Sequence, residues 1–296
     1  MPDFLERLKD PRPILMDGAT GTELERRGVE TSSAIWSAMA SFDTPSLLEN
    51  IHREYIEVGA EIITANTFRS QRRAMQKVGR GADSEHLTQA AVDIARKAVQ
   101  EIGRTVFVAG SMAPLEDCYS PQLVPPDNEL RREHAELANS LAAVGVDLLL
   151  VETMNTVREA AAAAEAAKTT GLPFGVSFVC RNDGRLLSGE SITDAVAAME
   201  TFEPNFLSVN CTPAQSLGLA LEELAFATKR PIAAYGNNGH SDDFADWEVN
   251  ENVGPEEYAR LVATWQQQGA SLLGGCCGTT PDHISAIQLV DKITEQ

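Results

Sequence analysis

The sequence predicts an α/β protein, a (β/α)8 TIM barrel that occupies the whole chain, residues 1–296, as a single domain. Three observations lead to this prediction. Short apolar runs of strand length recur, segments of helical periodicity separate them, and 296 residues is an ordinary length for one such barrel. No linker, charge block or low-complexity tract divides the chain. An open doubly wound sheet is the alternative, because it uses the same alternation of strand and helix.

The apolar runs lack the polar alternation that marks a half-exposed strand, and strands buried on both faces of a parallel sheet read this way. In order, the runs are ILMDG from residue 14, EIITANTF from 61, TVFVAGSM from 105, VDLLLVET from 146, PFGVSFV from 173, FLSVNC from 206, PIAAYGN from 231 and SLLGGCC from 271. Because each parallel strand needs a crossover helix, the last of these strands can pair with the first and close a barrel.

Amphipathic or alanine-rich segments between the runs predict the helices, and several end in glycine, a residue that stops a helix. Four clear examples span residues 44–60, 128–145, 155–171 and 254–270. Thr280 ahead of Pro281 predicts the start of a closing helix. Residues 18–43 are longer than a usual βα loop, so we expect this segment to cover an active site.

Composition narrows the classes of partner. The chain has 24 Lys and Arg against 43 Asp and Glu, a formal charge of -19, which disfavours nucleic acid and anionic membrane surfaces. We therefore expect small-molecule substrates, with a homo-oligomer left open. The first residues contain no secretory signal and no apolar run reaches membrane-spanning length, so a cytoplasmic location is expected. Five cysteines are too few for a disulfide scaffold and favour thiol chemistry or metal binding.

Polar residues finish most of the predicted strands, and in a barrel of this kind the chemistry gathers at those strand ends. They are Asp17 to Gly21, Asn66 and Thr67, Ser111, Glu152 and Thr153, Asn210 to Thr212, Asn237 and Asn238, and Cys276 and Cys277. Three sulfurs, those of Cys211, Cys276 and Cys277, therefore face one mouth. Three thiolates suit Zn²⁺, and the open fourth position favours catalysis over a structural role.

Other interpretations of the cysteines remain open on spacing alone. Cys118 and Cys180 read as small buried hydrophobic residues. The Cys276 and Cys277 pair could be inert or form a strained vicinal disulfide. On that view the chain would be a non-catalytic redox or metal-binding barrel that uses the pair as a thiol switch.

The motifs DGATGTELERRG (17–28), TANTF (64–68), VET (151–153), VNCT (209–212) and GGCCGTTPDHI (274–284) resemble those of the homocysteine S-methyltransferases, in the same order. The resemblance spans nearly the whole chain and includes the homocysteine module of cobalamin-dependent methionine synthase. It implies a zinc enzyme that moves a methyl group to the thiol of L-homocysteine and forms methionine. It also implies that Cys211, Cys276 and Cys277 hold Zn²⁺ while homocysteine takes the fourth position.

The resemblance carries further residues into the substrate site. It implies that Asp17 and Glu152 hold the amine of homocysteine. Backbone N–H groups of Gly18, Ala19 and Thr20 would receive its carboxylate. Three more polar residues at strand ends are expected in or behind the pocket, namely Thr67, Ser177 and Asn210. A side-chain oxygen of Asn237 or Asn238 would fill the fourth zinc position when homocysteine is absent.

The methyl donor is less defined by the sequence. Betaine-specific members of this family place an aromatic residue directly after the glutamate of the fourth strand, whereas this chain has Thr153, which disfavours betaine. A sulfonium donor such as S-methylmethionine is favoured, with S-adenosylmethionine, a corrinoid and betaine as alternatives. Selenohomocysteine is the alternative acceptor. Aromatic residues of the long loops, Trp36, Phe42 and Trp247, are expected to cover a sulfonium methyl group.

Overall fold

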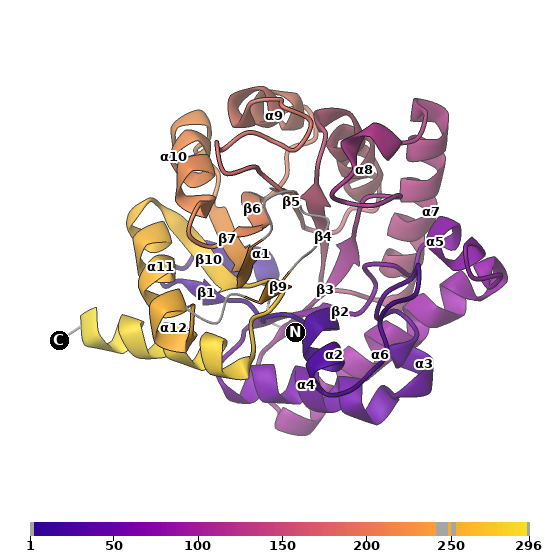
Figure 1. Cartoon of the computed structure of the whole chain (residues 1–296), viewed down its shortest axis with the longest axis horizontal. Helices are drawn as coiled ribbons and strands as arrows, with labels where there is room; N and C mark the ends of the chain where they lie inside the picture. The colour runs from indigo at the N-terminus through magenta and orange to yellow at the C-terminus, as the bar shows by residue number, and fades with distance from the viewer. Residues whose placement is uncertain (1–2, 241–247, 250–252, 295–296) are drawn as a thin grey trace.

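A computed structural model describes residues 3–240, 248–249 and 253–294 of the chain. Its parallel strands lie inside a ring of helices (Figure 1). The barrel strands are β1 (Ile14–Leu15), β2 (Ile62–Ala65), β3 (Phe107–Met112), β4 (Leu148–Met154), β5 (Phe174–Phe178), β6 (Phe206–Pro213), β7 (Ile232–Asn237) and β10 (Ala270–Gly275). All the strands predicted from the apolar runs are thereby confirmed.

The strand order is β1-β10-β7-β6-β5-β4-β3-β2, with parallel pairing throughout. A bridge from Met16 to Ile62 joins the two ends of this order, and the N–H of Asp17 donates to the carbonyl of Ile62 at 2.9 Å. The sheet is therefore a nearly closed (β/α)8 barrel. The open doubly wound alternative is wrong, because such a sheet leaves its two edge strands apart.

Helices alternate with the strands as predicted, and one further helix, α1, precedes β1. They are α1 (Phe4–Leu8), α2 (Gly21–Arg26), α3 (Ala40–Asp43), α4 (Pro45–Glu57), α5 (Arg72–Gln76), α6 (Ser84–Ile102), α7 (Asp127–Val144), α8 (Val157–Thr169), α9 (Ile192–Met199), α10 (Leu217–Ala227), α11 (Pro255–Gln267) and α12 (Pro281–Thr294). Gly103 and Gly145 end α6 and α7 in the left-handed region, with φ of 69° and 83°. Glycine adopts this conformation without the penalty that a Cβ brings, so it terminates these helices.

One end of the barrel is sealed by apolar packing. The ring of Phe4, on α1, packs against the rings of Phe107 and Phe206 in T-shaped contacts, at centroid distances of 5.4 and 6.3 Å. Those two residues begin their strands, so α1 covers the amino-terminal end of the barrel. Helix α1 does not cover the opposite end of the barrel, where the strands end, so that end can hold a functional site. A short antiparallel pair, β8 (Gly239–His240) and β9 (Glu248–Val249), follows β7 on that side.

The long segment between β1 and α4 has structure of its own. Residues 18–43 contain the short helices α2 and α3, separated by an irregular stretch. Trp36 and Ser37, from that stretch, line a cavity at the strand ends, as expected for a segment that covers an active site.

Candidate active site

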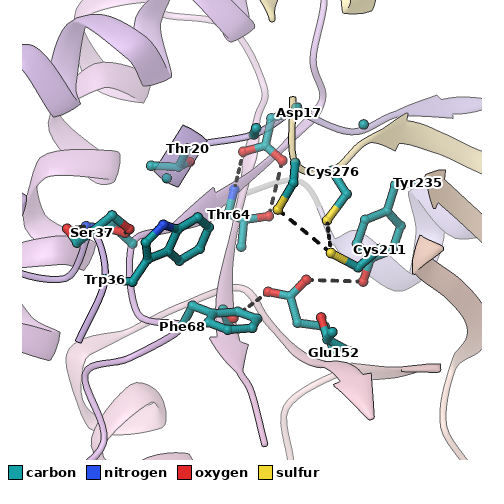
Figure 2. Close-up of a pocket in the computed structure, with 18 of the residues that line it drawn as sticks. Asp17, Thr20, Trp36, Ser37, Thr64, Phe68, Glu152, Cys211, Tyr235 and Cys276 are labelled. Carbon is teal, nitrogen blue, oxygen red and sulfur yellow. Dashed lines mark hydrogen bonds between the residues drawn. The ribbon is translucent and has the colours of Figure 1, made fainter. Parts of the chain in front are cut away.

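A cavity of about 240 Å³ opens at the carboxyl ends of the strands. Residues from β1, β2, β3, β4, β6, β7 and β10, or directly after them, contribute to its wall. Figure 2 shows sulfur atoms and Tyr235 on one side of this cavity and Trp36 and Phe68 on the other, with Asp17 and Glu152 between the two sides.

The three cysteines predicted to face one mouth do meet. Their sulfurs lie within 4.8 Å of one another. Sγ of Cys211 is 3.0 Å from Sγ of Cys276 and 3.8 Å from Sγ of Cys277. These hydrogen bonds hold the pKa of the Cys211 thiol well below its ordinary value, since they favour its thiolate form.

Local backbone geometry brings two consecutive cysteines to one point. Cys211 has a φ of 51° and Gly278 a φ of 78°, so the chain turns sharply at both sides of the cluster. A Cβ on Gly275 would lie 2.3 Å from Oγ1 of Thr279, which makes glycine necessary directly before the pair. The N–H of Cys276 donates to the carbonyl of Gly236 at 2.9 Å and anchors the turn to β7.

The cysteine cluster fits a metal ion. Tetrahedral Zn²⁺ with Zn–S bonds near 2.3 Å places its sulfurs roughly 3.8 Å apart. The distance between Cys211 and Cys277 already has this value, and the distance between Cys211 and Cys276 would have to open slightly. The remaining two cysteines lie outside the cluster. Burial raises the pKa of Cys118 to about 12 and that of Cys180 even further, so both are protonated, as expected for buried hydrophobic residues.

Asp17 and Glu152 line the same cavity and are almost completely buried. Burial raises the pKa of Asp17 to about 7, against the opposing effect of two hydrogen bonds from Thr64, at 2.7 Å from its N–H and 3.2 Å from its hydroxyl. Burial likewise raises the pKa of Glu152 to about 8, although Ser111 and Tyr235 donate to its carboxylate. Neither carboxylate has a cationic partner among the described residues, which leaves both ready to receive a positively charged ligand group.

The loop after β1 closes tightly around the strand end. A Cβ on Gly18 would lie 2.8 Å from both the Thr279 and the Tyr55 hydroxyl oxygens, so no larger residue fits there. Gly18, Ala19 and Thr20 all line the cavity. The N–H of Ala19 donates to Oγ1 of Thr279 at 3.2 Å, and a ligand carboxylate would compete with that bond.

Three predicted pocket residues lie behind the wall of the cavity. The hydroxyl of Thr67 donates to the carbonyl of Ser111 at 3.0 Å and accepts from its N–H at 2.9 Å. The carboxamide oxygen of Asn210 accepts from Ser177 at 2.7 Å and from the N–H of Thr153 at 2.9 Å. Because Thr153 has a φ of 60°, these bonds hold a strained backbone directly after Glu152.

Asn237 and Asn238 are both buried, and none of their described side-chain hydrogen bonds goes to a sulfur. Oδ1 of Asn238 is buried and has no described hydrogen-bond partner. The amide group of Asn237 donates to the carbonyl of Cys211 at 2.8 Å, and its oxygen accepts from the N–H of Gly239 at 3.2 Å. The amide nitrogen of Asn238 lies 3.2 Å from Nε2 of His283. Neither residue lines the cavity.

Sequence reasoning missed several residues of the wall. Tyr119 comes from the loop after β3, and its hydroxyl lies 3.2 Å from Sγ of Cys211. Tyr235 lies inside β7 and contacts Glu152. Arg69 brings a cation into the cavity wall, with its guanidinium 5.1 Å from the ring of Phe68. The alternating direction of side chains along β7 could have indicated Tyr235 as a residue of the barrel interior. No sequence pattern marks Tyr119, which lies in an irregular loop.

The three aromatic residues expected near a donor have different positions. Trp36 lines the cavity. Phe42 packs against His86 at a centroid distance of 5.0 Å and under the guanidinium of Arg80, away from the cavity. Trp247 lies outside the described residues.

Among the described residues, no helix has the length and apolar character needed to cross a membrane.

The sequence of the chain is similar to those of enzymes of one family. The chain is 31% identical to "Selenocysteine Se-methyltransferase" of Brassica oleracea var. italica, over 92% of this chain and 87% of that protein. It is also 31% identical to "Homocysteine S-methyltransferase 2" of Arabidopsis thaliana, over 97% of this chain and 95% of that protein.

Structural comparison agrees with the sequence comparison. The crystal structure of the homocysteine methyltransferase MmuM from Escherichia coli, described as its metallated form, superposes with a TM-score of 0.83 at 29% identity, over 95% of this chain and 97% of that one. The family model for homocysteine S-methyltransferase matches residues 14–290. These matches confirm the resemblance of the motifs, and the chain belongs to the homocysteine S-methyltransferase family.

Proposed function

We propose that this protein transfers a methyl group from a small sulfonium donor, such as S-methylmethionine, to the thiol of L-homocysteine and forms methionine, with Zn²⁺ as its cofactor. The observation that carries the proposal is the meeting of two unlike groups in one cavity. Three cysteine sulfurs lie within 4.8 Å of one another, and two buried carboxylates without a described cationic partner share the cavity with them.

Cys211, Cys276 and Cys277 would hold the metal, since thiolates are preferred ligands of Zn²⁺ and three of them leave one position for a substrate. When bound, Zn²⁺ supplies Lewis-acid chemistry that keeps the sulfur of homocysteine as a thiolate near neutral pH, where a free thiol with a pKa near 8.5 is mostly protonated.

Asp17 and Glu152 would bind the ammonium group of homocysteine. Their pKa values of about 7 and about 8 reflect burial without a counter-charge, and an ammonium group supplies that counter-charge. Backbone N–H groups of Gly18, Ala19 and Thr20 would receive the carboxylate. With both ends of the amino acid fixed, the thiol is oriented for in-line attack, to which methyl transfer is sensitive.

In the transfer step, the thiolate sulfur of homocysteine attacks the methyl carbon of the sulfonium. A new S–C bond forms while the bond from carbon to the positive sulfur breaks, and its electron pair stays on the donor sulfur. The donor leaves as a neutral thioether, and the thiol proton has already passed to solvent. Thr153 in the cavity wall directly after Glu152 argues against an aromatic cage for betaine at that position.

A selenol acceptor is the second candidate function. The observation in its favour is the 31% identity to a protein named selenocysteine Se-methyltransferase. Competition between homocysteine and selenocysteine or selenohomocysteine for one donor measures the acceptor preference.

We further propose that residues 1–296 act as one domain and that the protein works in the cytoplasm, where a reducing environment keeps the five free cysteines reduced.

The test is methionine formation from homocysteine with a panel of donors, read by mass spectrometry on protein loaded with Zn²⁺. The panel contains S-methylmethionine, S-adenosylmethionine, dimethylsulfoniopropionate and betaine. We expect about one zinc per chain in the wild type, and loss of both zinc and activity in Cys211→Ala. Cys180→Ala is the matched control, because Cys180 is equally buried but lies outside the cluster. Zinc retention by Cys211→Ala, or no methionine from any donor, would contradict the proposal.

A further inference from the structure

A tyrosine hydroxyl reaches the cysteine cluster from the loop between β3 and α7. Oη of Tyr119 lies 3.2 Å from Sγ of Cys211, and the Tyr119 side chain lines the cavity. The same side chain packs against a buried apolar group made of Val179, Leu187 and Cys211. The contact between the hydroxyl and the sulfur therefore belongs to a packed wall of the cavity.

The loop around Tyr119 is held from two other strand ends. After β2, Nη1 of Arg69 donates to the carbonyl of Glu116 at 2.7 Å. After β4, Nδ2 of Asn155, a fully buried residue, donates to the carbonyl of Cys118 at 2.9 Å. Because Cys118 directly precedes Tyr119, this second bond fixes the backbone from which the tyrosine side chain reaches the sulfur.

In a metal-bound cluster, the direction of this hydrogen bond is fixed. A cysteine that binds Zn²⁺ does so as a thiolate, which has no proton and can only accept. A tyrosine hydroxyl has an ordinary pKa near 10 and carries its proton at neutral pH. The hydroxyl of Tyr119 would therefore donate to Sγ of Cys211, and a hydrogen bond to a charged acceptor is stronger than one between neutral groups.

We propose that Tyr119 is a positioning residue that tunes the metal centre through Cys211. This inference rests on the proposed function. Three protein thiolates and the thiolate of homocysteine bring four negative charges to one divalent ion, and like charges at such short range repel strongly. The donated hydrogen bond draws electron density from Cys211 and lowers this repulsion. Tyr119 thereby favours both retention of the metal and binding of the homocysteine sulfur as a thiolate.

The first test reads the metal centre without turnover. Tyr119→Phe removes the hydroxyl and keeps the ring, so the packing against Val179 and Leu187 remains. Protein loaded with Co²⁺ in place of Zn²⁺ absorbs light by charge transfer from sulfur to metal. We expect this band to move to lower energy in the variant, because Cys211 becomes more electron-rich. Zinc affinity, measured by competition with a chelator, is expected to fall roughly tenfold. An unchanged band would overturn the proposal.

Tyr235→Phe is the matched control for both metal readouts. It also removes a hydroxyl from the cavity wall, but that hydroxyl donates to the carboxylate of Glu152 at 3.4 Å. We expect the position of the band and the zinc affinity to match those of wild type. A shift as large as that of Tyr119→Phe would mean that the cavity as a whole, and not the bond to Cys211, sets the band, which would contradict the proposal.

A second replacement gives a result that lost packing cannot imitate. 3-Fluorotyrosine at position 119 is a stronger proton donor than tyrosine and keeps the hydroxyl. At a pH where its phenol stays protonated, we expect the band to move to higher energy, opposite to the shift of Tyr119→Phe. Shifts in the same direction for both replacements would contradict hydrogen-bond donation to Cys211.

Turnover separates this inference from the proposed function. With zinc saturating, Tyr119→Phe is expected to raise the KM for homocysteine roughly threefold to tenfold, while kcat does not fall, because the bound sulfur keeps more of its charge. A fall in kcat with unchanged KM would contradict the proposal. If wild type makes methionine and Tyr119→Phe keeps the wild-type band and KM, Tyr119 has no such role and the proposed function stands. If the band shifts but wild type makes no methionine, the hydrogen bond to the metal centre stands and the acceptor assignment is wrong.

Discussion

Two carboxyl groups of the site are buried, and burial disfavours their ionised form. Asp17 and Glu152 have pKa values of about 7 and about 8, above the values of about 4 that carboxyl groups have in an unfolded chain. The folded protein therefore binds more protons than the unfolded protein between about pH 4 and pH 8. These two groups therefore favour the folded state most below about pH 4. Their contribution to the free energy of unfolding falls as the pH rises from about 4 to about 8.

This predicts that Asp17→Asn and Glu152→Gln stabilise the protein without ligand at high pH. The gain in free energy of unfolding over wild type should be small at pH 5 and on the order of 1–3 kcal/mol at pH 8. Urea unfolding at the two pH values measures it. A gain of the same size at both pH values would show that the carboxyl groups are not protonated in the folded protein.

Gly21 is a second residue whose identity matters. An added Cβ would lie 2.3 Å from the Trp36 ring, so the ring would have to move. We expect Gly21→Ala to destabilise by about 1–3 kcal/mol through overpacking and to change the fluorescence of Trp36. Gly218→Ala is the matched control, since its Cβ would be an ordinary 3.4 Å from the flexible end of Gln268 and alanine favours the helix. A gain in stability for both variants would contradict the packing argument.

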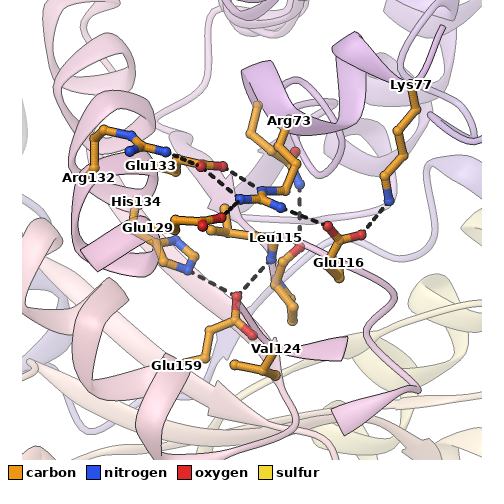
Figure 3. A network of polar contacts seen from close by, with 12 residues as sticks. Arg73, Lys77, Leu115, Glu116, Val124, Glu129, Arg132, Glu133, His134 and Glu159 are labelled. Atoms are coloured by element: carbon orange, nitrogen blue, oxygen red, sulfur yellow. Dashed lines mark hydrogen bonds and ion pairs between the residues drawn. The ribbon is translucent and has the colours of Figure 1, made fainter. Parts of the chain in front are cut away.

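The loop between β3 and α7 carries Tyr119 to the cysteine cluster. Figure 3 shows the polar contacts that hold this loop to neighbouring helices. The carboxylate of Glu159, on α8, accepts from the N–H of Leu115 at 2.8 Å and lies 3.2 Å from Nε2 of His134. Arg73, on α5, pairs with Glu116 of the loop at 3.1 Å. The loop is thus held to the outer helices although it has little regular structure.

Glu159→Ala tests this anchor. It leaves the N–H of Leu115 buried without an acceptor, which should cost about 1–3 kcal/mol of unfolding free energy. Faster hydrogen exchange is expected in residues 113–126. Glu159→Gln keeps an oxygen for Leu115, so it should cost less and leave the loop protected. Equal exchange rates in wild type and both variants would mean that the loop is held by its other contacts alone.

At the scale of the whole molecule, the two ends of the chain close the barrel. β1 pairs with β10, residues 14–15 with 272–273, and Met16 then bridges to Ile62 on β2. The strand that begins the barrel therefore completes its pairing only when the strand that ends it is in place. This dependence supports treating residues 1–296 as one domain.

If residues 1–296 form one domain, the protein should unfold in one cooperative transition. Urea unfolding followed by far-ultraviolet circular dichroism, which reports helices, should coincide with unfolding followed by tryptophan fluorescence. Trp36 lies near the start of the chain and Trp265 on α11 near its end, so the fluorescence samples both. Separate transitions for the two probes would divide the chain into more than one unit.

Local patterns in the sequence predict the buried parallel strands and their crossover helices, because these patterns need no knowledge of distant contacts. The same patterns also fit an open sheet, and the bridge between Met16 and Ile62 shows that the strands form a nearly closed barrel. The sequence also located Cys211, Cys276, Cys277, Asp17 and Glu152, since a parallel barrel brings all its strand ends to one face. The motifs then supplied the family, which the comparisons confirm.

Which side chains line the cavity and which support it depends on tertiary contacts that the sequence patterns do not show. Thr67, Ser177 and Asn210 end up behind the wall, while Tyr119 and Trp36 reach into it from irregular loops. The physical reason is that a loop's path depends on contacts made far away in the sequence, such as Glu159 with Leu115 and Gly21 with Trp36. The raised pKa values of Asp17 and Glu152 have the same origin, because burial is a property of the folded whole.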